Sequence, residues 1–201
     1  MTDLLTAKAI MGESFIGPNE LRQLSSLRIK VEDDVPEISY SETELNKKKN
    51  DYILILCEKS FIDGDSITIR NLKKRLGYEP LVNEPCFYNQ DWYEKEAFID
   101  FQLDHKWLLI RKNIFESSRA VQPEELMQKF SFPSAIECAY AFFLCWYVLN
   151  IKLWYHDFVW CSDFDHNGDR IYVGKYHDID GVNKNGFSIH RHLSLRQCYG
   201  C

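Results

Sequence analysis

The dipeptide Asn167-Gly168 constrains the fold more than any other feature, because it lies between two runs that alternate apolar and polar residues, 157–165 and 170–176. A type I′ turn needs positive φ at both of its central residues, and Asn-Gly adopts this conformation readily. The pattern therefore predicts an antiparallel β-hairpin with Asn167 and Gly168 at its turn. In that register, Asp165 faces Arg170 across the hairpin.

The predicted register divides the hairpin into two faces. The face expected to pack on the core carries apolar side chains, those of Trp160, Phe164, Ile171 and Val173. The face expected to stay in water carries mostly charged side chains and one tyrosine: Asp163, Asp165, Arg170 and Tyr172. A cross-strand pair of opposite charge, such as Asp165 with Arg170, stabilises a hairpin by roughly 0.2–1 kcal/mol.

A calcium loop is the alternative interpretation of the same stretch. Its acidic and amide residues repeat the first half of an EF-hand loop, and the candidate metal ligands are Asp163, Asp165, Asn167 and Asp169. The second half of the motif is missing, because Gly174 stands where the loop needs a bidentate glutamate. The flanking runs also have the periodicity of strands and not of helices. We therefore favour the structural hairpin and keep the metal site as its rival.

A zinc site is a further hypothesis for the end of the sequence. His190 and His192 lie in the run 187–195, whose alternation predicts a third strand, so both side chains point to the same side. Cys198 and Cys201 follow, and the four side chains together offer the donors of a tetrahedral zinc site. Their spacing matches no common zinc motif, so an exposed polar strand face is the favoured interpretation.

Composition limits the classes of function. The 201 residues include 30 acidic and 24 basic side chains, a formal net charge of −6, which argues against binding to nucleic acid or to an anionic membrane. The 7 cysteines are an odd number and several lie in apolar runs, which indicates reduced thiols and a cytoplasmic protein. We expect no signal peptide. The longest apolar run, 138–149, is shorter than the about 20 residues that a membrane span needs.

The order of predicted elements indicates an α+β fold. Helices are predicted near 18–24, 42–49, 71–76, 92–98, 123–127 and 133–149, and strands at 52–57, 106–111, 157–165, 170–176 and 187–195. The three last strands form an antiparallel β-meander that we expect to pack on two helices. Residues 81–201 make up this α+β domain, and residues 1–80 form a smaller α/β part with helices and one strand.

The second half of the chain resembles the C-type-lectin-like fold, in which a strand and two helices precede a meander. It is similar to modules of this fold in phage and bacterial variable proteins and in the formylglycine-generating-enzyme-like group, whose tails combine Trp-x-Ser, a Tyr-Val strand, an Asn/Gly-rich loop and Gly-Phe before an Arg. The matching positions here are 160–162, 172–174, 183–187 and Arg191. The segment 92–96, before the strand 106–110, also looks like part of a family of uncharacterised bacterial proteins. The sugar-binding triplets of lectins are absent, so the resemblance implies a scaffold that presents a binding face on its meander, and neither sugar binding nor formylglycine chemistry.

Two hypotheses about function follow. The favoured one is a non-enzymatic binding or assembly module, cytoplasmic or associated with a phage, a virion or a mobile element. A protein partner would contact the exposed meander face, which carries Trp160, Asp163, Asp165, Tyr172, His190 and His192. The alternative is a metal-dependent hydrolase or nuclease that holds Ca²⁺ or Zn²⁺ with the acids and histidines of this face. No serine or cysteine has a recognisable nucleophile motif, and no glycine-rich phosphate loop occurs.

Overall fold

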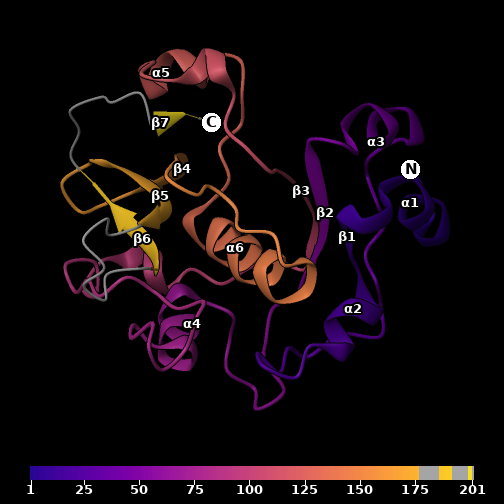
Figure 1. Cartoon of the computed structure of the whole chain (residues 1–201), viewed down its shortest axis with the longest axis horizontal. Coiled ribbons are helices and arrows are strands. Elements are labelled where there is room, and N and C mark those ends of the chain that lie inside the picture. Colours follow the sequence, from indigo (N-terminus) through magenta and orange to yellow (C-terminus); the bar gives the residue numbers. More distant parts are fainter. Residues whose placement is uncertain (177–185, 192–198, 201) are drawn as a thin grey trace.

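The computed structural model describes residues 1–176, 186–191 and 199–200. Two small sheets lie on opposite sides of a long central helix, α6 (Ala135–Leu149), as Figure 1 shows. The chain is thus a mixed α/β protein, with six α-helices in its described part. The candidate ligands His192, Cys198 and Cys201, and the part of the predicted third strand beyond residue 191, lie outside the described residues.

The first sheet is formed by β1 (Phe15–Ile16), β2 (Tyr52–Cys57) and β3 (Lys106–Arg111). β2 lies in its centre, parallel to β1 and antiparallel to β3. The predictions of strands at 52–57 and 106–111 are confirmed with these bounds. Every residue of β2 after the first is buried, which is why its sequence is a continuous apolar run. Since β3 lies beyond residue 80, the two predicted parts of the chain share this sheet.

The helices of the N-terminal part are α1 (Leu4–Met11), α2 (Pro18–Gln23), α3 (Glu42–Lys48) and α4 (Ile69–Leu76), with a short 3₁₀ helix, η1 (Gly12–Ser14), after the first. Local caps explain where they begin and end. The Ser41 hydroxyl accepts a hydrogen bond from the N–H of Glu44, and Gly77 ends α4 with a φ of 69°, a value that favours glycine. The helices near 18–24, 42–49 and 71–76 are confirmed, whereas α1 was not predicted.

The helix predicted at 92–98 is wrong, because these residues form a turn that leads into a 3₁₀ helix, η2 (Ala97–Asp100). Tertiary contacts override helix propensity here: the Trp92 indole N–H donates to the carbonyl of Ile189, and Glu96 binds His166. η3 (Glu116–Ser118) and α5 (Pro123–Leu126) follow β3. α6 begins two residues after Pro133, because Ser134 and Glu137 form a capping box.

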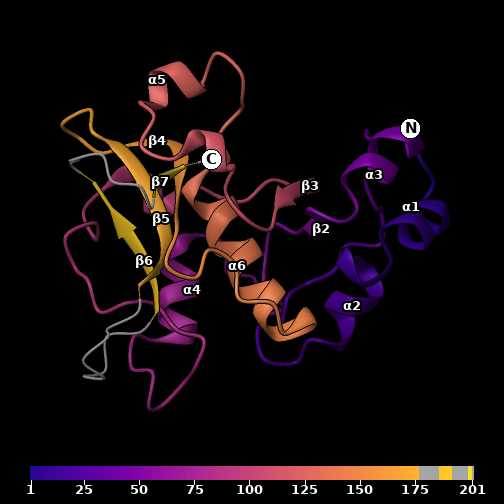
Figure 2. The same cartoon turned by 45° about the horizontal axis from the view of Figure 1, so that its top comes forward.

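The second sheet contains β4 (Phe158–Phe164), β5 (Arg170–Tyr176), β6 (Gly186–His190) and β7 (Tyr199–Gly200), in the order β6-β5-β4-β7. β4, β5 and β6 are antiparallel neighbours, which confirms the meander, and β7 is parallel to β4. One face packs on α6 in the main core, and the other is covered by residues 121–132, including α5 (Figure 2). The meander therefore has α6 on one face and α5 on the other.

The register predicted for the β4–β5 hairpin is wrong near the turn. Asp165 pairs with Asp169, since the N–H of Asp165 donates to the carbonyl of Asp169 at 2.9 Å. Gly168 alone takes the left-handed conformation, with a φ of 84°, and Asn167 keeps a negative φ. This is a type I turn followed by a glycine bulge, which places Phe164 opposite Arg170. An irregularity between Trp160 and Phe164 shifts the register again.

The register change corrects the predicted faces of β4, because a slip of one residue turns the side chains of one strand to the opposite face relative to its neighbour. On β5, Ile171 and Val173 are buried in the main core, as predicted. Phe164, expected in the core, is 49% exposed. Asp163, Asp165 and Tyr172, expected in water, are all buried. Trp160 is buried as predicted, but it lies opposite Tyr172 and away from Ile171 and Val173.

One continuous core joins both sheets to α6. It contains residues of β1, β2 and α4 together with those of β4, β5 and β6. Tyr140 of α6 is buried and donates its hydroxyl to the carbonyl of Leu56 in β2 at 3.1 Å. Within the described residues, no helix combines the length and the apolar character needed to cross a membrane.

Replacing Phe143 by alanine should destabilise the fold strongly, because its ring is fully buried in α6 and contacts Phe87, Phe142 and Phe187. We expect a loss of about 3–5 kcal/mol in the free energy of unfolding, measured by urea denaturation. The control is Phe101→Ala, whose ring is 53% exposed and which should cost about 0.5 kcal/mol or less. Equal losses for the two variants would contradict the position of α6 in the core.

Candidate functional site

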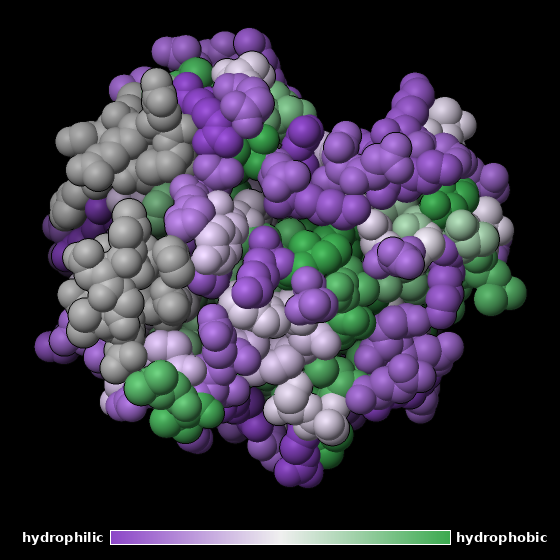
Figure 3. All heavy atoms as spheres, in the orientation of Figure 1, coloured by the Kyte–Doolittle hydropathy of each residue, from purple (hydrophilic) through white to green (hydrophobic). Residues whose placement is uncertain are grey.

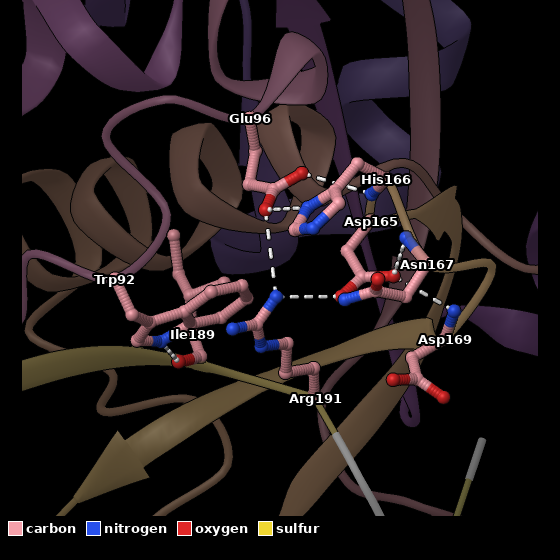
Figure 4. Close-up of polar contacts among 8 residues, drawn as sticks. All are labelled: Trp92, Glu96, Asp165, His166, Asn167, Asp169, Ile189 and Arg191. Atoms are coloured by element: carbon pink, nitrogen blue, oxygen red, sulfur yellow. Dashed lines mark hydrogen bonds and ion pairs between the residues drawn. The ribbon is translucent and has the colours of Figure 1, made fainter.

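The polar residues of the β4–β5 turn gather with two residues from distant segments into what we call the turn cluster: Glu96, Asp165, His166 and Arg191 (Figure 4). Glu96 binds His166 twice, accepting from ring Nδ1 at 2.6 Å and from the backbone N–H at 2.9 Å. Arg191 Nη1 lies 2.7 Å from Asp165 Oδ2 and 3.5 Å from Glu96 Oε1. The cluster thus ties the turn to the segment before η2 and to the end of β6.

Asp165 accepts hydrogen bonds from its own turn as well as from Arg191. Its Oδ1 accepts from the N–H of Asn167 at 2.9 Å and from that of Asp169 at 2.8 Å. Burial alone raises the pKa of Asp165, but these N–H groups and Arg191 outweigh it and lower the pKa to about 2. The side chain is therefore a charged structural acceptor with its oxygens already engaged.

The predicted calcium ligands do not come together as a set. Asp163 binds elsewhere, Asn167 directs its amide nitrogen at Asp165 Oδ2 at 3.4 Å, and the carboxylate of Asp169 points away from the cluster (Figure 4). Among the described residues, the group that offers three ligand atoms within 4.8 Å is Glu96, Asp165 and His166. The guanidinium of Arg191 already pairs with Asp165 and lies within 4 Å of Glu96, which makes a structural ion-pair network the better description.

Asp163 lies at the N-terminus of α6. Its Oδ2 accepts a hydrogen bond from the N–H of Ala135 at 2.6 Å, where a carboxylate also complements the helix dipole. Burial raises the pKa of Asp163, although this hydrogen bond acts in the opposite direction. Asp163 and Asp165 thus serve two separate structural contacts and form no common site.

The aromatic members of the predicted binding face do lie together. Trp160, Tyr172 and His190 occupy matching positions on β4, β5 and β6, and the rings of Tyr172 and His190 stack with centroids 5.2 Å apart. Trp160 and Tyr172 pack under α5 and the residues that follow it. Burial lowers the pKa of His190 to about 4, so its imidazole is neutral at pH 7. This row is mainly an internal layer and not the exposed face that we predicted.

An apolar groove of about 430 Å³ lies beside β3. It is lined by half-buried side chains from β3, from the residues after it and from the segment 129–133, among them Leu108, Leu109, Phe115, Phe130 and Phe132. Figure 3 shows apolar atoms in the middle of one face of the molecule, between polar surfaces on either side. The groove is of the size that binds ligand groups or side chains of a partner.

The rim of the groove carries positive charge. Lys48, Arg111 and Lys129 line it, together with Glu137, whose carboxylate is paired with Lys106 at 2.7 Å. Lys48 is paired with Glu44, whereas no carboxylate of the described residues lies within 4 Å of the Arg111 or Lys129 side-chain nitrogens. The Arg111 guanidinium lies 3.6 Å from the centre of the Phe115 ring. In a chain of net charge −6, this local excess of cations favours acidic ligands.

The chain matches no protein-family model, no curated protein and no solved structure. The assignment of a function therefore rests on geometry.

The geometry offers a binding surface more clearly than a catalytic centre. The free cysteines of the described residues are all buried, and burial raises the pKa of each of their thiols, which makes them weak nucleophiles. The groove was not predicted, and Glu96 and Arg191 entered only through the family resemblances. Each depends on contacts between segments far apart in sequence, which no local motif indicates.

Replacing Asp165 by asparagine should remove a pH-dependent part of the stability. We expect a loss of about 2–3 kcal/mol at neutral pH, because charged hydrogen bonds to Arg191 and the turn are lost. The pKa of Asp165 is lowered from its unfolded value of about 3.9, so its contribution is complete above about pH 5 and is lost as the pH falls toward about 2. Urea denaturation across this range should show wild type and variant converging at low pH. Asp104→Asn, with a side chain 78% exposed, is the control, and a constant gap between wild type and Asp165→Asn would contradict the account.

Proposed function

We propose that this chain is a non-enzymatic binding module that takes a segment of a protein partner in the groove beside β3. The observation that carries the proposal is the combination of an apolar lining with two rim cations, Arg111 and Lys129, that have no carboxylate within 4 Å among the described residues. Apolar contact supplies affinity in such a site, and rim charges select the partner and its orientation. The segment that fits best has apolar side chains flanked by carboxylates.

The turn cluster supports the same proposal by elimination. The carboxylates of Glu96 and Asp165 already bind Arg191, His166 and backbone N–H groups. They therefore hold the β4–β5 turn against the segment before η2 and the end of β6. The groove, in contrast, presents half-buried apolar groups that remain available at the surface.

We also propose that residues 81–201 form a C-type-lectin-like module. The order of β3, α5, α6 and the β4-β5-β6 meander supports this, as does the position of Arg191 directly after β6. The segments that line the groove then belong mostly to this module. A cytoplasmic location agrees with the buried free cysteines of the described residues.

A peptide titration followed by NMR tests the groove. We expect a short peptide with paired leucines between glutamates to shift the amide resonances of residues 108–115 and 129–133, because it matches both the apolar lining and the basic rim. The same peptide with lysines in place of the glutamates should bind at least about tenfold more weakly, a difference of about 1.4 kcal/mol.

The matched control for this titration is a pair of double variants. Arg111→Glu with Lys129→Glu should lose the preference for the acidic peptide, whereas Arg22→Glu with Lys59→Glu, at exposed positions outside the groove, should keep it. Equal binding of both peptides to the wild type, or shifts that map away from the groove, would contradict the proposal.

A metal-dependent hydrolase is the second candidate, and one observation favours it: Glu96, Asp165 and His166 offer ligand atoms within 4.8 Å. A metal at this position has to displace Arg191 from Asp165. We expect EDTA to leave the thermal midpoint of the purified protein unchanged within about 1 °C. A resident ion at 100 times its dissociation constant would instead stabilise the fold by about 2.7 kcal/mol. If EDTA lowers the stability of the wild type by this amount and does not lower that of the Asp165→Asn variant, the metal site is favoured.

A further inference from the structure

A second exposed feature of the chain matches the groove in chemistry. Leu81 and Val82, which we call the knob, are 82% and 81% exposed at the tip of a turn after α4. Contiguous exposed apolar groups are a feature of protein interaction sites. The knob is more exposed than Phe164, the large apolar side chain of the second sheet that is 49% exposed.

The backbone holds the knob in a fixed turn. The N–H groups of Val82 and Asn83 both donate to the carbonyl of Glu79, at 2.9 and 3.0 Å. Asn83 also donates from its side chain to the carbonyl of Leu76 at the end of α4, at 2.9 Å. The knob is therefore preorganised, which lowers the entropy cost of binding.

The charges beside the knob are negative. Glu79 and Glu84 flank it, both are exposed, and no cation of the described residues lies within 4 Å of either carboxylate. Three of the four basic residues of the neighbouring α4 are already paired with other acids: Arg70 with Asp100, Lys73 with Glu94, and Arg75 with Asp63. The fourth, Lys74, is exposed and has no carboxylate within 4 Å among the described residues. The knob thus combines apolar groups with two unpaired carboxylates.

We propose that the knob of one copy of this chain docks in the groove of a second copy. The proposal rests on the proposed function, since it names the occupant of the same groove. The apolar tip meets the lining around Leu109 and Phe130, while Glu79 and Glu84 meet the unpaired cations Arg111 and Lys129. Knob and groove are different surfaces, so the contact is head-to-tail. An assembly that does not close into a ring therefore keeps one free knob at one end and one free groove at the other.

The contact is small, and self-association should accordingly be weak and dependent on salt. We expect a dissociation constant in the range of about 0.1–1 mM at low ionic strength, and weaker association at about 1 M salt, where the Debye length falls to about 3 Å.

Analytical ultracentrifugation of mixed variants tests this directly. Leu81→Ser with Val82→Ser removes the knob, and Arg111→Glu with Lys129→Glu reverses the groove rim. Each double variant alone should sediment as a monomer at concentrations where the wild type associates. An equimolar mixture should form a one-to-one complex and nothing larger, because it contains only one intact knob–groove pair per two chains.

Control variants separate docking from effects on folding. Leu5→Ser with Ile62→Ser removes two other exposed aliphatic side chains, 80% and 59% exposed, and should leave association unchanged. Glu79→Lys with Glu84→Lys should abolish self-association, and a single chain that carries these changes together with Arg111→Glu and Lys129→Glu should associate again through the reversed pair of charges.

A wild type that stays monomeric at about 1 mM and low salt would overturn self-docking, since the expected dissociation constant lies at or below this concentration. So would a mixture of the knob and groove variants that forms no complex. If the acidic peptide still binds the groove, either result overturns self-docking only and the proposed function is retained. If the acidic peptide does not bind, the groove itself is contradicted as a binding site.

Discussion

The burial of α6 is the constraint on which the rest of the structure depends. Its residues are apolar around nearly the whole circumference, and those from Ala135 to Cys145 are buried with the exception of Glu137. Such a helix is stable only when other elements cover it from several sides. The first sheet does so through β2, where Leu56 accepts from Tyr140, and the second sheet does so through β4 and β5. The two sheets are therefore parts of one fold because they share this helix.

The acids of the β4–β5 hairpin serve the same arrangement. Asp163 binds the first N–H of α6, which fixes the helix start against β4, and Asp165 binds the turn and Arg191, which fixes β4 and β5 against the end of β6. Burying these carboxylates is unfavourable unless each receives hydrogen bonds. Each does, and the positions that looked most like a binding site in the sequence are therefore internal supports.

The sequence predicted local structure well and contacts between segments poorly. Strands 52–57 and 106–111 and the caps at Ser41 and Gly77 follow from signals within a few residues. The hairpin was predicted, but its register was not, since Asn167-Gly168 suits both a type I′ turn and a type I turn with a glycine bulge. Glu96 lies 70 residues before its partner His166, and Arg191 lies 26 residues after its partner Asp165. No spacing rule connects residues so far apart, and the groove arises in the same way from separate segments.

Asp163 and Asp165 are internal supports in different environments, which leaves the groove beside β3 as the proposed binding site. The most direct measurement is an NMR titration of the two side-chain carboxyl carbons. We expect Asp165 to titrate near pH 2 and the pKa of Asp163 to lie above the ordinary value of about 3.9. Two carboxyls that both titrate at that ordinary value would show that they face water, and would contradict the account.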